Sequence, residues 1–197
     1  MSTTALTAPL VRSRRTRRQP RSWRAIADRT ARILMGVAFT VGAAMLLLFE
    51  DAFRALEASL SAHVASPFVS QPAWSSRDYF YIWISDERLI GFHVTPECSA
   101  TILLAPLIIL AGGLLAGTRV RWIRTLTGTA VMIAVVLAVN VLRIALIGVF
   151  SKQWGMDTGY PIAHTFIGSA IAIIGFALGL AALLLIIGVR PRGKTRP

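Results

Sequence analysis

The sequence predicts an all-α membrane protein: a four-transmembrane-helix bundle with both termini cytoplasmic and a small extracytoplasmic segment between the first two helices. Three observations predict this fold class. Hydrophobic residues make up 55% of the chain and the mean hydropathy is +0.63, which is too high for a soluble domain. The apolar residues fall in blocks rather than in amphipathic stripes. Basic residues are gathered in alternate segments between those blocks.

Four blocks approach or exceed the ~20 residues that a helix needs to cross a bilayer core. Because lipid satisfies no backbone hydrogen bonds, each block is expected to be a helix. The predicted spans are residues 33–49, 99–117, 126–150 and 162–189. No repeat or linker separates a second domain, so we expect one membrane-embedded domain over 31–190, between basic cytoplasmic tails 1–30 and 191–197. The first tail has no small-residue cleavage site after it, which favours a retained, partly disordered tail over a removed signal peptide.

The distribution of charge predicts how the protein is oriented. Of the 21 lysines and arginines, nine precede the first span, three lie between the second and third, and four follow the fourth, so that sixteen share one side. The other side carries eight of the nine acids. By the positive-inside rule the basic side is cytoplasmic, and residues 50–98 and 151–161 face outward. The basic patches orient the protein and can contact anionic membrane lipids, so the net charge of +12 does not indicate a nucleic-acid partner.

The segment between the first two spans is the only sizeable extramembrane one. Phe53, Leu56, Leu60 and Val64 recur at helical spacing, which predicts that the first helix continues outward or lies on the membrane surface. The stretch SPFVSQP then ends this helix. Residues 79–94 are aromatic and β-branched on both sides of a polar centre, which predicts a β-hairpin that leads back to the membrane. Its aromatic residues could also form an interfacial belt.

The single cysteine, Cys98, stands at the outer end of the second predicted span. A lone cysteine cannot form an intramolecular disulfide, so it is either an inert buried residue or a reactive thiol. The third span carries Asn140 and Arg143 three residues apart, and therefore on one helical face. An arginine inside a span costs about 2.5–3.5 kcal/mol on insertion scales, so it is usually functional, the alternative being an anchor at the headgroups. Asn140 alone is more often a contact between helices.

His164 opens the fourth predicted span, and the topology places it at the same outer face. Thiol, guanidinium and imidazole thus come from three helices to one depth on one side. Histidine is the usual base for a cysteine nucleophile, and a nearby cation lowers the thiol pKa and can hold a developing oxyanion. The neighbouring Glu97 opposes formation of a thiolate, which makes the cationic partners more necessary.

Three segments, ECSATILL, NVLRI and HTFIG, resemble the signature segments of the exosortase/archaeosortase family. These are membrane cysteine transpeptidases or proteases that process exported proteins carrying a C-terminal sorting signal. The resemblance covers about residues 79–185 and implies Cys98 as nucleophile, Arg143 as stabiliser of the oxyanion or thiolate, and His164 as proton donor and acceptor. The residues expected to support them are Asn140, Glu97 and Ser99. No cofactor and no metal are expected.

Two features set this chain apart within the resemblance. Ala100 stands where many members have glycine after Cys-Ser, which leaves the subfamily and its recognised signal open. The chain is also short beside bacterial exosortases with more spans, and it looks like a four-span core. The implied substrates are exported proteins whose tail has a short motif outside the membrane, a transmembrane helix and a basic cluster inside.

The charge distribution adds a statement about recognition. The predicted cytoplasmic face has sixteen basic residues and one acid, so it repels the basic cluster of the substrate, and recognition is expected outside and within the bilayer. Small-residue faces could accept the substrate helix, although packing inside the protein's own bundle is the favoured alternative. These faces comprise Gly112, Gly113, Ala116 and Gly117 in the second span, and Gly168, Gly175 and Gly179 in the fourth.

Functions of other classes fit the sequence less well. A zinc hydrolase could draw on His63, His93 and His164, but no HExxH or comparable ligand spacing is present. A non-enzymatic membrane scaffold or assembly factor would account for the bundle but not for the convergence of Cys98, Arg143 and His164. A transporter would need polar groups through the membrane midplane, whereas these cluster at one surface.

Overall fold

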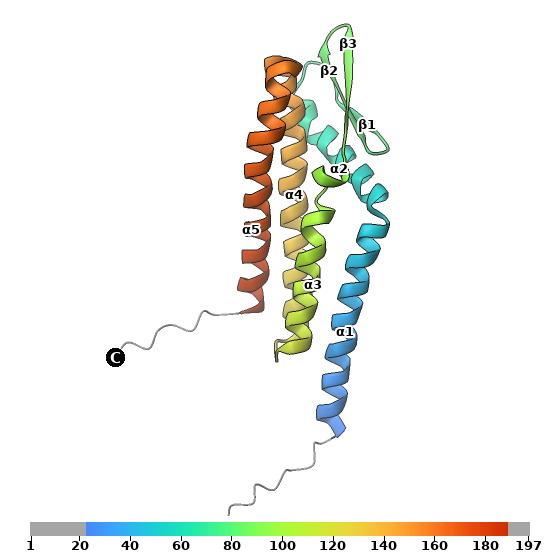
Figure 1. The fold of residues 1–197 in the computed structure, drawn as a ribbon, viewed down its shortest axis with the longest axis vertical. Helices are drawn as coiled ribbons and strands as arrows, with labels where there is room; N and C mark the ends of the chain where they lie inside the picture. Colours follow the sequence, from blue (N-terminus) through green and yellow to red (C-terminus); the bar gives the residue numbers. More distant parts are fainter. Residues whose placement is uncertain (1–22, 189–197) are drawn as a thin grey trace, which may run out of the picture.

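The computed structural model describes residues 23–188, which are mostly helical (Figure 1). Four helices run along the long axis: α1 (Trp23–Leu48), α3 (Thr101–Gly117), α4 (Trp122–Trp154) and α5 (Gly168–Ile187). The shorter α2 (Glu50–Ala65) and a small β-sheet lie at one end of this bundle, whereas α1 begins and α5 ends toward the other.

Within residues 23–188, three helical stretches are long and apolar enough to cross a membrane: Ile26–Leu48, Trp122–Gly159 and Ile162–Ile187. They correspond to the first, third and fourth predicted spans. α3 occupies the position of the second predicted span but has only 17 residues, at the short end of membrane-crossing helices. The helical membrane fold is therefore confirmed, while the count of four spans and the cytoplasmic placement of both termini stay predictions.

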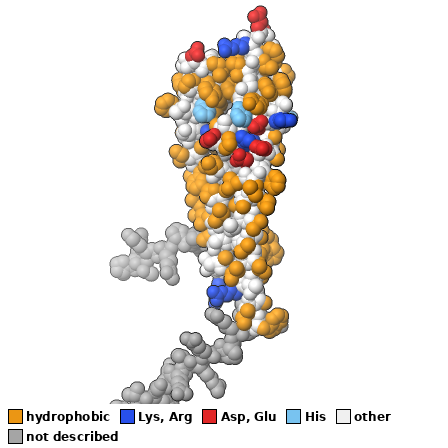
Figure 2. All heavy atoms as spheres, turned by 45° about the vertical axis from the view of Figure 1, so that its right-hand side comes forward, with side chains coloured by type: hydrophobic (Ala, Val, Ile, Leu, Met, Phe, Trp, Pro, Cys, Tyr) orange, Lys and Arg blue, Asp and Glu red, His pale blue; other side chains and the backbone are white. Residues whose placement is uncertain are grey.

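The charged residues and the apolar surface are separated along the long axis. On the face drawn in Figure 2, hydrophobic side chains cover the middle of the bundle, and acidic and histidine side chains gather toward the end with α2 and the sheet. Exposed apolar residues such as Leu34, Ile173 and Leu185 need a lipid environment, because water would make this surface costly.

α1 begins at Trp23, well before the predicted start of the first span and inside the stretch predicted to be a disordered tail. Arginine and alanine are good helix formers, which explains why the helix extends through them. Arg32 also ties α1 to the end of α3, since its Nη1 donates to the carbonyl oxygens of Thr118 (3.3 Å) and Val120 (2.6 Å). Residues 1–22 and 189–197, which include the rest of both predicted tails, lie outside the described residues.

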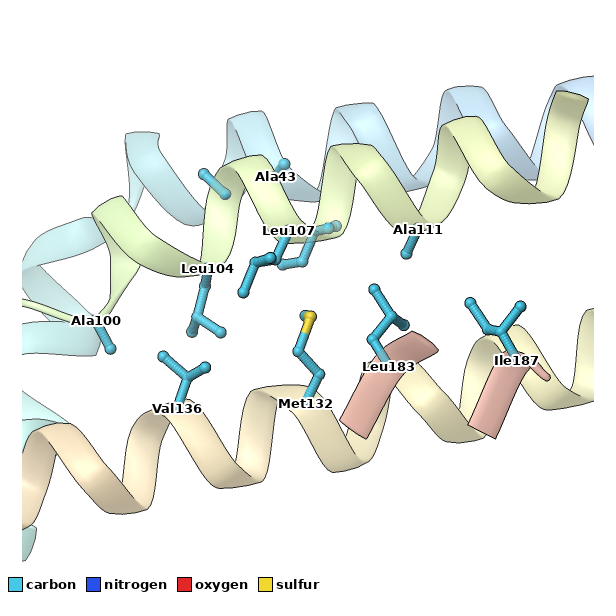
Figure 3. Close-up of a cluster of buried hydrophobic side chains, with 11 residues drawn as sticks. Ala43, Ala100, Leu104, Leu107, Ala111, Met132, Val136, Leu183 and Ile187 are labelled. Atoms are coloured by element: carbon cyan, nitrogen blue, oxygen red, sulfur yellow. The ribbon is translucent and has the colours of Figure 1, made fainter. Parts of the chain in front are cut away.

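The main core lies between α3, α4 and α5 (Figure 3). Leu104 and Leu107 of α3 face Met132 and Val136 of α4, and Leu183 of α5 closes the cluster, each at most 2% exposed. Lipid is as apolar as leucine, so this cluster holds the helices together by close packing rather than by removing apolar surface from water.

Small residues allow the helices to approach closely. A Cβ on Gly112 of α3 would lie 2.7 Å from Phe39 Cβ and 3.0 Å from the Gly36 carbonyl oxygen of α1. A Cβ on Gly175 of α5 would lie 2.8 Å from Val139 Cγ1 of α4. These glycines are therefore used inside the protein's own bundle, the alternative that the sequence favoured. Only open space adjoins Gly113, by contrast.

A helix was expected over the 53–64 stretch, and α2 is that helix, separated from α1 by a break at Phe49. Leu56, Leu60 and Val64 of its apolar stripe face outward, at 46%, 37% and 39% exposed, whereas Phe53 packs against the main core. Its buried face carries instead a set of charged, hydroxyl and small residues: Arg54, Glu57, Ala58, Ser61, Ala62 and Ala65. α2 thus turns polar groups toward the protein and apolar groups away from it, as a helix at a membrane surface can.

The predicted β-hairpin is confirmed as an antiparallel pair, β2 (Tyr79–Ser85) and β3 (Arg88–His93). A third short strand, β1 (Trp74–Ser76), pairs with β2 and was not predicted. The order β1-β2-β3 leaves β3 at an edge of the sheet. Phe80 and Ile82 of β2 are fully buried against α2 and α4, and this second core fixes the sheet over the end of the bundle.

Candidate active site

Cys98 lies on a tight turn between the sheet and α3. The chain leaves β3 and makes one turn of 3₁₀ helix, Pro96–Cys98, in which the proline sits at a position where its missing N–H costs nothing. The Cys98 N–H donates to the Thr95 carbonyl oxygen at 2.9 Å, and α3 begins at Thr101. Cys98 is 8% exposed, so its thiol has little room to move just before the start of α3.

His164 reaches the same place from the junction of α4 and α5. After α4 the chain turns at Gly155, whose φ of +78° suits glycine, and continues through two π-helical turns, Gly155–Gly159 and Ile162–Ile167. Such turns are wider than an α-helix and occur often at functional sites. His164 Nε2 lies 3.2 Å from Cys98 Sγ, so the structure brings together these two sequence-predicted residues.

A buried hydrogen-bond network holds the backbone from Cys98 to Ala100. Asn140 Nδ2 of α4 donates to the Cys98 carbonyl oxygen at 2.9 Å and to Glu57 Oε1 at 2.7 Å. Glu57 of α2 also accepts from Ser99 Oγ at 2.6 Å and from the Ala100 N–H at 2.9 Å. These hydrogen bonds connect α2 and α4 to residues 98–100, which lead into α3.

Arg143 belongs to this network and makes no hydrogen bond to the thiol among the described residues. It is 8% exposed, and its Nη1 donates to Asn140 Oδ1 at a long 3.4 Å. Its Nε is buried and has no hydrogen-bond partner among the described residues. Gly168 leaves the room for this group, since a Cβ there would lie 3.1 Å from Arg143 Nε. The guanidinium therefore sits against α5 one turn beyond His164, and its buried Nε–H has no partner among the described residues.

The remaining predicted residues divide into one that joins the network and one that does not. Ser99 joins it as a donor to Glu57, and its Oγ also accepts from Thr101 Oγ1 at 3.0 Å. Glu97 is exposed and makes no hydrogen bond to the thiol, guanidinium or imidazole within residues 23–188. Hydrogen bonds from its own N–H and from the Thr95 side chain lower its pKa, so it stays a solvated carboxylate beside the site.

Glu57 is the residue that sequence reasoning missed. It is 0% exposed, and burial raises its pKa, although the hydrogen bonds from Ser99, Ala100 and Asn140 act in the opposite direction. From the sequence, Glu57 was recognised only as one of the eight acids on the predicted outer side. A signal was present in the small residues Ala58 and Ser61 beside it on one helical face, which mark that face as the packed one.

A cleft of about 280 Å³ adjoins the Cys98–His164 pair. One wall is β3 with the residues that follow it, from Ile90 to Thr95, and the other is formed by α4 and the π-helical turns, including Ile147 and Tyr160. The Tyr160 ring stacks on His164 at a centroid distance of 5.2 Å. Burial first, and then the charge of Cys98, raise the pKa of Tyr160, which is therefore a neutral phenol at the cleft wall.

The histidines of the zinc alternative are engaged elsewhere. His63 Nδ1 lies 2.8 Å from the Ser59 carbonyl oxygen, and His93 Nε2 lies 2.9 Å from Asp78 Oδ2. No cluster of three histidine, cysteine or acidic side chains that could hold a metal occurs in the described part of the chain. The three histidines of this alternative thus form no cluster that could hold a metal among the described residues, although His93 and His164 both line the cleft described above.

The geometry defines a class: a membrane protein with a part-buried cysteine–histidine pair at the end of a helix bundle, facing a cleft. The family model of transmembrane exosortases matches residues 29–185, and the chain belongs to this family. The resemblance found in the sequence is therefore confirmed, and the chain is in general terms a membrane cysteine transpeptidase. No curated protein and no solved structure matches it.

Proposed function

We propose that this protein cleaves C-terminal sorting signals of exported proteins at the outer face of the cell membrane, through a thioester formed on Cys98. The observation that carries the proposal is the 3.2 Å contact between Cys98 Sγ and His164 Nε2 at the wall of a cleft. A thiol within hydrogen-bond reach of an imidazole can be converted to the thiolate, which is the nucleophilic form.

The first half of the reaction forms the acyl-enzyme. His164 Nε2 accepts the thiol proton, and the Cys98 sulfur attacks the carbonyl carbon of the scissile peptide bond. The oxyanion that develops needs a donor that is not already committed, and the uncommitted Nε of Arg143 fits that role. His164 then gives its proton to the leaving amine as the C–N bond breaks, which leaves a thioester.

The second half releases the product. An acceptor, water or an amine, attacks the thioester carbon while His164 takes its proton, and the C–S bond breaks to return the sulfur. Asn140, Ser99 and Glu57 support both halves by fixing the peptide units around Cys98. No step of this scheme requires a metal or an organic cofactor.

The substrates we propose are exported proteins whose C-terminal tail has a short motif, a transmembrane helix and a basic cluster. Sixteen basic residues of this chain lie at the ends of the predicted spans that we place in the cytoplasm, where they contact anionic lipid and repel the substrate's cluster. The cluster then acts as an anchor, and recognition takes place outside and within the bilayer. Nucleic acid has no place in this scheme.

The test compares the C-termini of membrane proteins in cells that contain wild-type protein, Cys98→Ala or His164→Ala. Tails of the three-part form should be shortened with the wild type and intact with Cys98→Ala, because no thioester can form. His164→Ala should slow cleavage by at least about 10²-fold, the usual contribution of a general base, and leave a trace of hydroxylamine-sensitive adduct. His63→Ala, which changes an exposed histidine of α2, is the matched control.

Shortened tails in the Cys98→Ala cells would overturn the nucleophile assignment. The scaffold alternative would then account better for the protein, and the prediction specific to it is that complexes of other membrane proteins are lost while all tails remain uncut.

A further inference from the structure

The cleft beside Cys98 runs along the free edge of β3. Its lining includes six consecutive residues, from Ile90 through Thr95. Successive side chains of a strand point to opposite faces of the sheet, so a cleft on one face would contact every second residue. A cleft lined by consecutive residues must instead follow the edge, where main-chain N–H and C=O groups are presented.

The strand register identifies which main-chain groups face the cleft. The Val94 N–H donates to the Asp78 carbonyl oxygen at 2.9 Å, and His93 pairs with Tyr79, Gly91 with Tyr81. In an antiparallel pair, residues that bond to the partner strand alternate with residues that do not. Since Val94 bonds toward β2, the alternate residues His93 and Gly91 direct their N–H and C=O groups away from β2.

These groups have no other strand to bond with. β3 is the last strand of the described sheet, and β2 is its one neighbour there. A row of unpaired main-chain donors and acceptors is a template for an added strand. The other wall of the cleft is formed by α4 and the π-helical turns, and it occupies the place that the sheet of a second copy would need. The cleft therefore suits a single inserted strand and not edge-to-edge pairing of two copies.

We propose that the polypeptide to be cleaved binds as an extended strand added to β3, held by its main-chain amides to Gly91 and His93. This inference rests on the proposed function, because it places the scissile bond at Cys98. The cleft is continuous from the strand edge to the Cys98–His164 pair, so a chain bound along the edge passes the thiol. Recognition at this edge depends on peptide conformation, and side-chain pockets add the choice of motif.

The probe for the test is acetyl-Ala-Ala-Ala chloromethyl ketone, which has a peptide backbone and minimal side chains. The Cys98 sulfur displaces chloride from it, forming a C–S bond as the C–Cl bond breaks. Chloroacetone carries the same reactive group without the peptide and serves as reference. Because the chain has one cysteine, the mass increase of the intact purified protein beyond that of Cys98→Ala reports Cys98.

We expect the peptide to label Cys98 faster than chloroacetone does. The effect of methylating a backbone amide on this rate should alternate from one amide to the next. Each hydrogen bond to β3 is worth about threefold to tenfold in rate. Successive amides of a bound strand point in opposite directions. Methylating the first or the third peptide nitrogen should therefore slow labelling while methylating the second does not, or methylation of the second alone should slow it. Equal sensitivity at all three nitrogens, or none at any, would overturn the proposal.

A pair of variants tests the same point from the protein. His93→Pro and His93→Ala both lose the imidazole and its contact with Asp78, but only the proline variant also loses the N–H that faces the cleft. The ratio of peptide to chloroacetone labelling should be about threefold to tenfold lower in His93→Pro than in His93→Ala. Equal ratios would contradict the added strand, and the methylated peptides decide the matter if the proline variant does not fold.

The outcome is separable from that of the proposed function. If the thiol were not activated by the imidazole, His164→Ala would leave the chloroacetone rate unchanged, whatever the peptide ratio. If the thiol were activated but β3 bound nothing, His164→Ala would lower the chloroacetone rate and the peptide would show no advantage.

Discussion

Glu57→Ala tests how the network around Cys98 is held. The Glu57 carboxylate accepts three hydrogen bonds, from the Ser99 hydroxyl, the Ala100 N–H and the Asn140 amide, all in a fully buried place. Alanine removes all three acceptor contacts and leaves the donors where water does not reach. The change is therefore a loss of hydrogen bonds inside the protein and not at its surface.

The magnitude follows from counting which donors have a second partner. Asn140 Nδ2 keeps its bond to the Cys98 carbonyl oxygen, whereas the Ala100 N–H and the Ser99 O–H lose their acceptor. A buried donor without a partner costs about 1–3 kcal/mol, so that Glu57→Ala should lose about 2–6 kcal/mol of stability. Glu57→Gln keeps an acceptor for two of the three donors and should lose about 1 kcal/mol or slightly more.

Two measurements on the purified protein in detergent check this expectation. The thermal midpoint should fall in the order wild type, Glu57→Gln, Glu57→Ala. The rate of Cys98 labelling by chloroacetone should change in the same order, because the turn that aims the thiol at His164 is loosened. Glu50→Ala is the matched control, since Glu50 begins the same helix and accepts no side-chain hydrogen bond within the described residues.

A wild-type midpoint together with a wild-type labelling rate in Glu57→Ala would refute the reasoning. It would mean that the Ser99 and Ala100 donors find other partners and that Glu57 does not position Cys98. A lowered midpoint with an unchanged labelling rate would limit Glu57 to stability.

Two further predictions concern topology and packing. A membrane-impermeant maleimide applied to intact cells should label Cys98, slowly because the thiol is 8% exposed, with Cys98→Ala as background; protection until the membrane is permeabilised would reverse the predicted orientation. Gly112→Leu should lower the thermal midpoint by overpacking, at a cost of about 1–3 kcal/mol, because a Cβ there would lie 2.7 Å from Phe39 Cβ. Gly113→Leu enters open space and should leave the midpoint nearly unchanged, so equal effects of the two would contradict the packing described for α1 and α3.

The parts of the fold that follow local patterns were predictable. The long apolar blocks became helices, and the aromatic run interrupted at residues 85–88 became a hairpin. β1 was missed because three residues carry too little of the alternating pattern to indicate a strand. The direction of α2 was also out of reach, since the same stripe of Leu56, Leu60 and Val64 suits a helix that faces either a protein core or lipid.

The sequence predicted at which end of the bundle the site lies, but not the contacts between its residues. Topology alone brought Cys98 and His164 to one end of the bundle, and the structure places them in contact. Topology does not fix rotation about a helix axis, so it did not reveal that Arg143 is linked to the cysteine turn through Asn140. Glu57 depends on donors more than 40 residues away in sequence, so only the assembled fold reveals it.

The unequal lengths of α3 and α4 have a consequence for the membrane. α4 has 33 residues and is about 50 Å long at 1.5 Å per residue, well beyond a hydrocarbon core of ~30 Å, whereas α3 has 17 residues and is about 26 Å long. Of the two helices, α3 is therefore the one that falls short of the hydrocarbon core, by about 4 Å, and its first turn follows Cys98. Where α3 crosses the bilayer, thicker leaflets with longer acyl chains would rise past that turn and cover the thiol. The lipid composition of the membrane would then set how readily a peptide reaches it.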